Sequence, residues 1–135
     1  MRRLSRAQRI RKRPEFVRIQ DGGLRVNARH FLVLLAAGPA PDGPARLGVV
    51  ASRKVGGSVE RNRAKRLVRE VFRHATDLFP PGVDVVVIVR PGAHTLRFAD
   101  AEDELHAVAA QIRRRAQDAL RRGPPEARSQ GRPPS

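Results

Sequence analysis

The sequence predicts an α+β fold, a mixed α/β sandwich in which helices pack on a small central sheet. Residues 83–89 (Val-Asp-Val-Val-Val-Ile-Val) are the clearest strand, because β-branched residues dominate them. Residues 59–76, the Arg-rich helix, are the clearest helix, because their apolar side chains recur at the i, i+3, i+4 and i+7 spacing. Alternation of the two patterns gives the order α-β-β-α-β-α. The length suits one domain with a single core, which we place at residues 14–122.

Two flanking segments are expected to lie outside this domain. Residues 1–13 hold many Arg and Lys residues and no acidic residue. Such a block repels itself, so it predicts a basic mobile arm. Residues 123–135 are rich in Pro, Gly, Ser and Arg, a composition typical of a disordered tail.

The first half of the domain is expected to contain one helix and two strands. Pro14 suits the first turn of a short helix, which ends at residues 21–23 (Asp-Gly-Gly). Residues 30–37 and 46–52 are apolar runs of strand length, and the Gly- and Pro-rich residues 38–44 between them form a loop. We expect the two strands to pair as a hairpin through that loop.

The second half is expected to hold the Arg-rich helix, a strand and a long helix. Ser58 is a suitable N-cap for the Arg-rich helix. Residues 98–122 predict one long helix, with acidic residues near its start and Arg residues near its end, as the helix dipole favours. The unit from residue 46 to 89 is long enough to place its two strands parallel. Continuous apolar strands also indicate that both faces of the sheet are at least partly covered.

The charge points to a polyanionic partner. The 135 residues include 28 Lys and Arg against 13 Asp and Glu, a formal net charge of +15. Repulsion among so many positive charges opposes a compact fold. Binding to a polyanion is the simplest reason for the protein to carry this charge. The chain has no Cys, which is compatible with a reducing cytosol. No apolar run approaches the roughly 20 residues that span a bilayer, so we expect a soluble cytoplasmic protein without a membrane partner.

The Arg-rich helix has one apolar and one cationic side. The guanidinium group is planar, always charged and forked, so it suits bidentate contact with phosphate. Such a helix is often only a solvated face, but here a basic loop precedes it. We therefore interpret the cationic side as a nucleic-acid surface. Its polar members are Asn62, Lys65, Arg66, Arg69 and Arg73.

Residues 48–72 (Gly-Val-Val-Ala-Ser-Arg-Lys-Val-Gly-Gly-Ser-Val-Glu-Arg-Asn-Arg-Ala-Lys-Arg-Leu-Val-Arg-Glu-Val-Phe) closely resemble the signature of the bacterial ribonuclease P protein component. In that family a strand leads into a basic, Gly-containing loop and then into an Arg-Asn-Arg helix. Weaker similarity covers nearly the whole ordered chain, including residues 14–16 (Pro-Glu-Phe) and 27–31 (Asn-Ala-Arg-His-Phe).

The resemblance implies an RNA-binding subunit of ribonuclease P, the endoribonuclease that removes the 5′ leader from precursor tRNA. The catalyst is then a ribonuclease P RNA with its own Mg²⁺ ions, and the protein supplies no catalytic residue, no metal site and no cofactor of its own. The family also has a left-handed crossover between its parallel strands, whereas general physics favours the right-handed one. The residues that would contact the RNA subunit are Arg53, Lys54, Arg61, Asn62, Arg63, Lys65, Arg66, Arg69 and Arg73.

The resemblance further implies a cleft for the single-stranded leader, between the first helix and the sheet. Aromatic residues are frequent there in the family. Here Phe16 is present, but Gln20 and Leu34 occupy neighbouring positions, and the chain has no Trp or Tyr and only 5 Phe. We therefore expect leader contacts to depend on the arm and on Arg18, Arg25 and Arg29 more than on stacking.

Three other functions remain open at this stage. A small basic ribosomal or other RNA-binding protein would share the charge and the tail. A DNA-binding regulator could place the helix in a major groove, although only Asn62 is a candidate base reader. A stand-alone nuclease would need a base and a metal site, but His30, His74, His94 and His106 are scattered along the sequence. The sequence makes no prediction of an oligomeric state.

Overall fold

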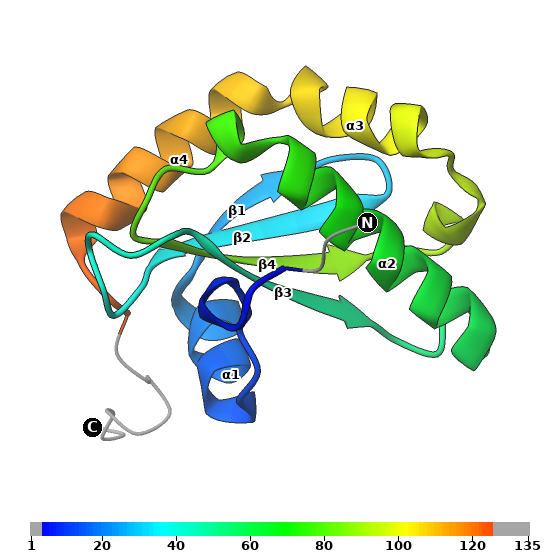
Figure 1. Cartoon of the computed structure of the whole chain (residues 1–135), viewed down its shortest axis with the longest axis horizontal. Helices are drawn as coiled ribbons and strands as arrows, with labels where there is room; N and C mark the ends of the chain where they lie inside the picture. The colour runs from blue at the N-terminus through cyan, green and yellow to red at the C-terminus, as the bar shows by residue number, and fades with distance from the viewer. Residues whose placement is uncertain (1–3, 126–135) are drawn as a thin grey trace.

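The computed structural model describes residues 4–125 and shows a four-stranded sheet with helices on both faces (Figure 1). The strand order is β1-β2-β4-β3. Helix α1 covers one face, whereas α2, α3 and α4 lie on the other. The predicted α+β class is confirmed. The helices and strands are α1 (Arg13–Gly22), β1 (Leu24–Asn27), β2 (Phe31–Ala37), β3 (Arg46–Ala51), α2 (Ser58–His74), β4 (Val83–Val89), α3 (Phe98–Ala107) and α4 (Ala109–Arg122), with 3-10 turns at Arg6–Gln8, Thr76–Leu78 and Ala93–Thr95.

The sheet is mixed. β3 and β4 are parallel, as expected, while β4 pairs with β2 and β2 with β1 in antiparallel fashion. The predicted hairpin between β2 and β3 is wrong, because β4 lies between them. β4 is almost wholly buried, while most of β3 is only partly buried. A strand in the centre of a sheet is paired along both of its edges, and the more apolar β4 takes this position. β3 is therefore left at the edge of the sheet.

The strand β1 is an addition to the predicted order. It has four residues, of which only Val26 is buried, and a run this short lacks a clear periodic signal. Val26 lies opposite Val33 of β2. Pairing with β2 therefore stabilises a strand that its own sequence does not indicate.

Alternate residues along the strands belong to two apolar clusters, one on each face of the sheet. In β2, Val33 and Leu35 belong to the larger cluster beneath α2 and α4, whereas Leu32 and Leu34 belong to the smaller cluster beneath α1. All seven residues of β2 are buried. The expectation that both sheet faces are covered is confirmed.

The predicted long helix is divided into α3 and α4. Val108 interrupts it with φ −112° and ψ 19°. α3 packs on α2, whereas α4 packs on β1 and β2. One straight helix cannot follow both partners, so the chain bends between them (Figure 1).

The N-terminal segment is docked rather than free. Leu4 and Ile10 are buried, with exposed fractions of 5% and 4%. The backbone N–H of Ile10 donates to the carbonyl oxygen of Leu47 on β3 at 2.9 Å. The predicted mobile arm is therefore wrong for residues 4–10, because two apolar side chains anchor them along the open edge of β3. Residues 1–3 lie outside the described residues.

Helix α4 ends at Arg122, where the last helix was predicted to end. The predicted disordered tail falls mainly on residues 126–135, which lie outside the described part of the chain. None of the helices within residues 4–125 is both long and apolar enough to cross a bilayer.

Candidate nucleic-acid interface

Helix α2 is held by its apolar side, so its cationic side is directed outward. Ala64, Val68, Val71 and Phe72 are buried against the sheet. The helix begins one residue earlier than predicted: Gly57 is the N-cap, and its backbone N–H donates to Oε1 of Glu60 at 2.9 Å. The predicted N-cap role of Ser58 is therefore wrong.

The outward side of α2 carries the cations predicted from the sequence. Asn62, Arg63, Arg66 and Arg69 are exposed, and Arg61, Lys65 and Arg73 are half-buried. Arg53 and Lys54 are exposed in the turn that precedes the helix. The structure thus brings the whole predicted set onto one helix and its entry loop, which we call the α2 basic surface.

Most of this charge has no salt-bridge partner among the residues that the structure describes. The salt bridges of α2 that lie within residues 4–125 involve only Arg73, with Glu70 at 2.8 Å, and His74, with Glu70 at 3.5 Å. Loss of hydration lowers the pKa of Arg69, and the positive charges of Arg9 and Arg66 lower it further. Crowded cations of this kind favour binding of an anion from outside the chain.

A cleft of about 470 Å³ opens between α1, β3 and α2. We call it the α1–β3 cleft. Phe16 lies in it and approaches β3 closely, since a Cβ added at Gly48 would lie 2.5 Å from Phe16 Cε1. Glycine at this position lets the ring rest on the strand. The lining residues are Arg11, Arg13, Phe16, Val17, Gln20, Val49, Val50, Ala51 and Lys65.

The structure separates the predicted leader-binding residues. Phe16 and Gln20 both line the α1–β3 cleft. Arg18, about 200° around the helix from Phe16, lies elsewhere, with Nη2 4.0 Å from Oδ2 of Asp84. Leu34 is only 2% exposed, so it offers no surface to a ligand.

Arg25 and Arg29 also lie away from Phe16. Arg25 belongs to β1, at the sheet edge opposite to β3, and Arg29 is exposed in the turn that follows β1. The sequence could not show this, because it did not reveal the strand order.

Two residues of the cleft were missed as individual contacts. Arg13, Phe16, Val17 and Gln20 follow the i, i+3, i+4 and i+7 spacing, so Arg13 shares a helix face with Phe16. Arg11 precedes the helix and also lines the cleft. The spacing could have identified Arg13, whereas only the docking of the N-terminal segment brings Arg11 there.

An ion pair between half-buried Arg46 and buried Asp84 helps to hold α1 on the sheet. Asp84, the one buried charged residue within residues 4–125, is 1% exposed. Arg46 donates to it twice, from Nε to Oδ1 at 2.8 Å and from Nη2 to Oδ2 at 2.7 Å. Nη1 of Arg46 also donates to Oε2 of Glu15 on α1 at 3.2 Å. The hydrogen bond to Asp84 raises the pKa of Arg46 despite the opposing effect of burial. Through Glu15, Arg46 also ties α1 to the sheet.

Comparison with known proteins identifies the family. The sequence profile of the family described as Ribonuclease P matches residues 4–121. The chain belongs to the ribonuclease P protein family. The ribonuclease P protein component of Syntrophus aciditrophicus (strain SB) is 37% identical over 102 residues, or 76% of this chain and 84% of that protein. That of Herpetosiphon aurantiacus is 41% identical over 92 residues, or 68% and 73%.

Solved structures of ribonuclease P proteins have the same fold. That of Staphylococcus aureus is 32% identical, with a TM-score of 0.68 over 78% of this chain and 95% of that one. That of Thermotoga maritima is also 32% identical, with a TM-score of 0.66 over 78% and 96%. The resemblance inferred from residues 48–72 is thereby confirmed. Membership of this family decides against the ribosomal protein, the DNA-binding regulator and the stand-alone nuclease.

The described residues contain no cluster that could hold a metal ion. Within residues 4–125, no three His, Asp or Glu side chains come together for this purpose. His30 instead pairs with Glu104, with Nδ1 2.8 Å from Oε1. What this ribonuclease P protein offers is cationic surface and a cleft, both suited to binding RNA.

Proposed function

We propose that this protein is the RNA-binding subunit of ribonuclease P and assists the catalytic RNA in removing the 5′ leader from precursor tRNA. The observation that carries the proposal is the α2 basic surface, whose cations are mostly unpaired within the described residues. Membership of the ribonuclease P protein family implies a holoenzyme whose RNA such a surface can bind. Chemistry belongs to the RNA and its Mg²⁺ ions, and the protein binds and positions. The absence of Cys supports the cytoplasm as the compartment.

The ribonuclease P RNA is the proposed partner of the α2 basic surface. The exposed guanidinium groups of Arg63, Arg66 and Arg69 suit phosphate oxygens. Arg73 contributes less, because Glu70 already neutralises it. The proposed contact set is Arg53, Lys54, Arg61, Asn62, Arg63, Lys65, Arg66, Arg69 and Arg73.

The 5′ leader of precursor tRNA is the proposed occupant of the α1–β3 cleft. Phe16 can stack one base, and Arg11, Arg13 and Lys65 can bind the phosphates of a single strand. The cleft opens beside α2, so one RNA-bound protein can reach the leader. Arg25 and Arg29 lie at the opposite edge, which leaves them a general electrostatic role.

Cleavage of precursor tRNA by a bacterial ribonuclease P RNA at low Mg²⁺ tests the proposal. We expect the protein to raise the cleavage rate above that of the RNA alone. An unchanged rate would contradict the assignment.

The salt dependence of RNA binding tests the surface itself. Each phosphate contact contributes about 0.9 to the slope of log K against log salt. Arg61→Ala combined with Arg63→Ala should therefore flatten the slope by about two units. Arg114→Ala combined with Arg115→Ala is the matched control, since both residues are exposed on α4 and carry the same charge. Equal slopes for the two double variants would remove the α2 residues from the interface.

A further inference from the structure

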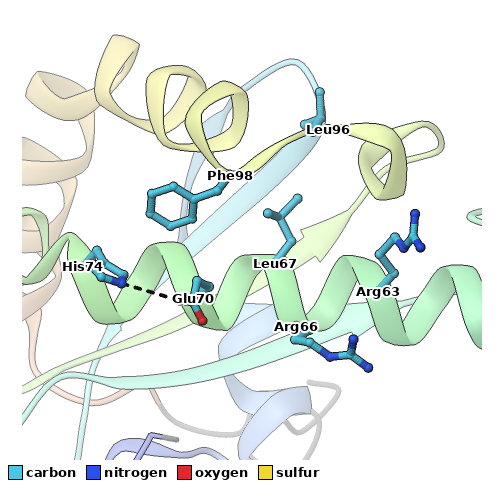
Figure 2. A pocket seen from close by; sticks show the side chains of 7 residues that line it. All are labelled: Arg63, Arg66, Leu67, Glu70, His74, Leu96 and Phe98. Atoms are coloured by element: carbon cyan, nitrogen blue, oxygen red, sulfur yellow. Dashed lines mark ion pairs between the residues drawn. The ribbon is translucent and has the colours of Figure 1, made fainter. Parts of the chain in front are cut away.

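A second hollow, of about 430 Å³, lies between α2 and the segment that enters α3 (Figure 2). We call it the α2–α3 pocket. Leu67 of α2 points toward Leu96 and Phe98 across this gap. All three side chains are only partly buried, although they pack against the main core. The protein thus presents an aromatic and aliphatic surface beside its basic helix.

The aromatic wall of the pocket is built from two rings. The imidazole of His74 meets Phe98 edge-on, with ring centroids 5.3 Å apart and an interplanar angle of 76°. Two rings held in this way form a corner. Flat aromatic groups stack favourably against such walls.

Both positively and negatively charged side chains line the pocket. Arg63 and Arg66 line it and form no salt bridge within residues 4–125. Glu70 also lines it, and its carboxylate is held by Arg73 and His74. The hydrogen bond from Arg73 lowers the pKa of Glu70, which stays ionised and accepts hydrogen bonds.

We propose that the α2–α3 pocket binds a single unstacked nucleobase of the RNA that α2 contacts, a base with an exocyclic amino group. This inference rests on the proposed function and deepens it. The ionised Glu70 repels a phosphate but accepts a hydrogen bond from the amino group of cytosine, adenine or guanine. Arg63 and Arg66 can bind the flanking phosphates, and Phe98 can stack on the base.

The division of charge decides the orientation of the nucleotide. A backbone threaded through the pocket would bring phosphate next to Glu70, which is unfavourable. A base inserted between Leu67 and Phe98 leaves its phosphates with the arginines. The pocket volume of about 430 Å³ falls in the range of small-molecule sites.

The test uses the full chain and a bacterial ribonuclease P RNA. Phe98→Leu keeps an apolar side chain but removes the stacking face. We expect it to weaken binding about fivefold or more at constant salt, with an unchanged salt slope. Arg61→Ala, which does not line the pocket, should instead change the slope. Thermal unfolding of Phe98→Leu shows whether the fold is retained.

Chemical probing of the Watson–Crick edges in the complex provides a second readout. We expect the unchanged protein to protect one unpaired base. In complexes with Phe98→Leu or with Glu70→Ala, which removes the acceptor, this base should become reactive while protection of the RNA backbone remains. Cytidine 5′-monophosphate should also shift the NMR signals of Phe98 and Leu96 in the free protein, whereas ribose 5-phosphate should not.

The outcomes separate the two proposals. If the protein binds and activates the RNA but Phe98→Leu changes neither affinity nor base protection, the pocket proposal is overturned and the proposed function stands. If the unchanged protein does not bind the RNA, the proposed function fails and the pocket proposal with it. Self-association of the free protein that Phe98→Leu abolishes would identify a second copy as the occupant and would also overturn the nucleobase.

Discussion

Removal of Arg46 should strongly destabilise the fold. The substitution Arg46→Met keeps the aliphatic part of the side chain and removes the guanidinium group. Asp84 would then lose both hydrogen bonds, at 2.8 and 2.7 Å, while it stays 1% exposed. A carboxylate left in this state loses most of the interactions that offset its loss of hydration.

The magnitude follows from this burial. Breaking a buried ion pair by removing one partner costs about 3–5 kcal/mol. Arg18 lies 4.0 Å from Asp84 and can partly replace Arg46, so we expect the lower end, about 3 kcal/mol. A domain of this size has a total stability of roughly 6–18 kcal/mol. The variant should therefore fold, with a Tm lower by about 12 °C.

Urea unfolding followed by far-UV circular dichroism measures this change. The chain has no Trp or Tyr, so intrinsic fluorescence gives little signal. Arg97→Met is the matched control, because the Arg97 side chain is 88% exposed and its pair with Asp100 spans 3.6 Å. Such an exposed pair should change the free energy of unfolding by less than about 1 kcal/mol.

A double variant separates the ion pair from mere packing. Arg46→Met combined with Asp84→Val removes both charges, and it should recover most of the stability lost in Arg46→Met alone. A loss below about 1 kcal/mol for Arg46→Met would refute the reasoning, since Asp84 would then have to be hydrated. A double variant no more stable than Arg46→Met would refute it as well.

Three further predictions concern the cleft and α2. Gly48→Ala should lower the free energy of unfolding by about 1–3 kcal/mol, because its Cβ would lie 2.5 Å from Phe16 Cε1; an unchanged urea midpoint would contradict the close packing. Phe16→Ala should weaken leader-dependent affinity less than Arg13→Ala at low salt, measured on precursor tRNAs with and without a leader, and the reverse order would show that stacking dominates. Arg73 is the main cause of the lowered pKa of Glu70, so Glu70 stabilises the fold above its unfolded pKa and this contribution is lost as pH falls through the lower folded value. At neutral pH, Glu70→Gln should therefore be less stable than the unchanged protein, by less than about 1 kcal/mol for a partly exposed pair. This difference in stability should vanish in acid. A difference that does not depend on pH would exclude the ion pair as its source.

Local signals in the sequence determined several elements and the helix at the centre of the proposed function. The β-branched run is β4, and the helix predicted at residues 59–76 is α2 (Ser58–His74), with its apolar side buried. The motif in residues 48–72 also sufficed to identify the family. These signals are periodic or contiguous, so they do not depend on which distant segments meet.

Only the tertiary structure decided which segments are neighbours. Burial of β4 on both faces placed it between β2 and β3, and this order put Arg25 at the edge opposite to Phe16. The same competition for burial docked Leu4 and Ile10 against the domain, where charge alone predicted a free arm.

The candidate sites show the same division. The cations of α2 were predictable one by one, because a helix fixes which of its residues share a face. The α1–β3 cleft and the α2–α3 pocket are each built from segments far apart in the chain. Sequence alone therefore determined that this protein carries a basic helix for RNA, while long-range packing decided which side chains stand beside it.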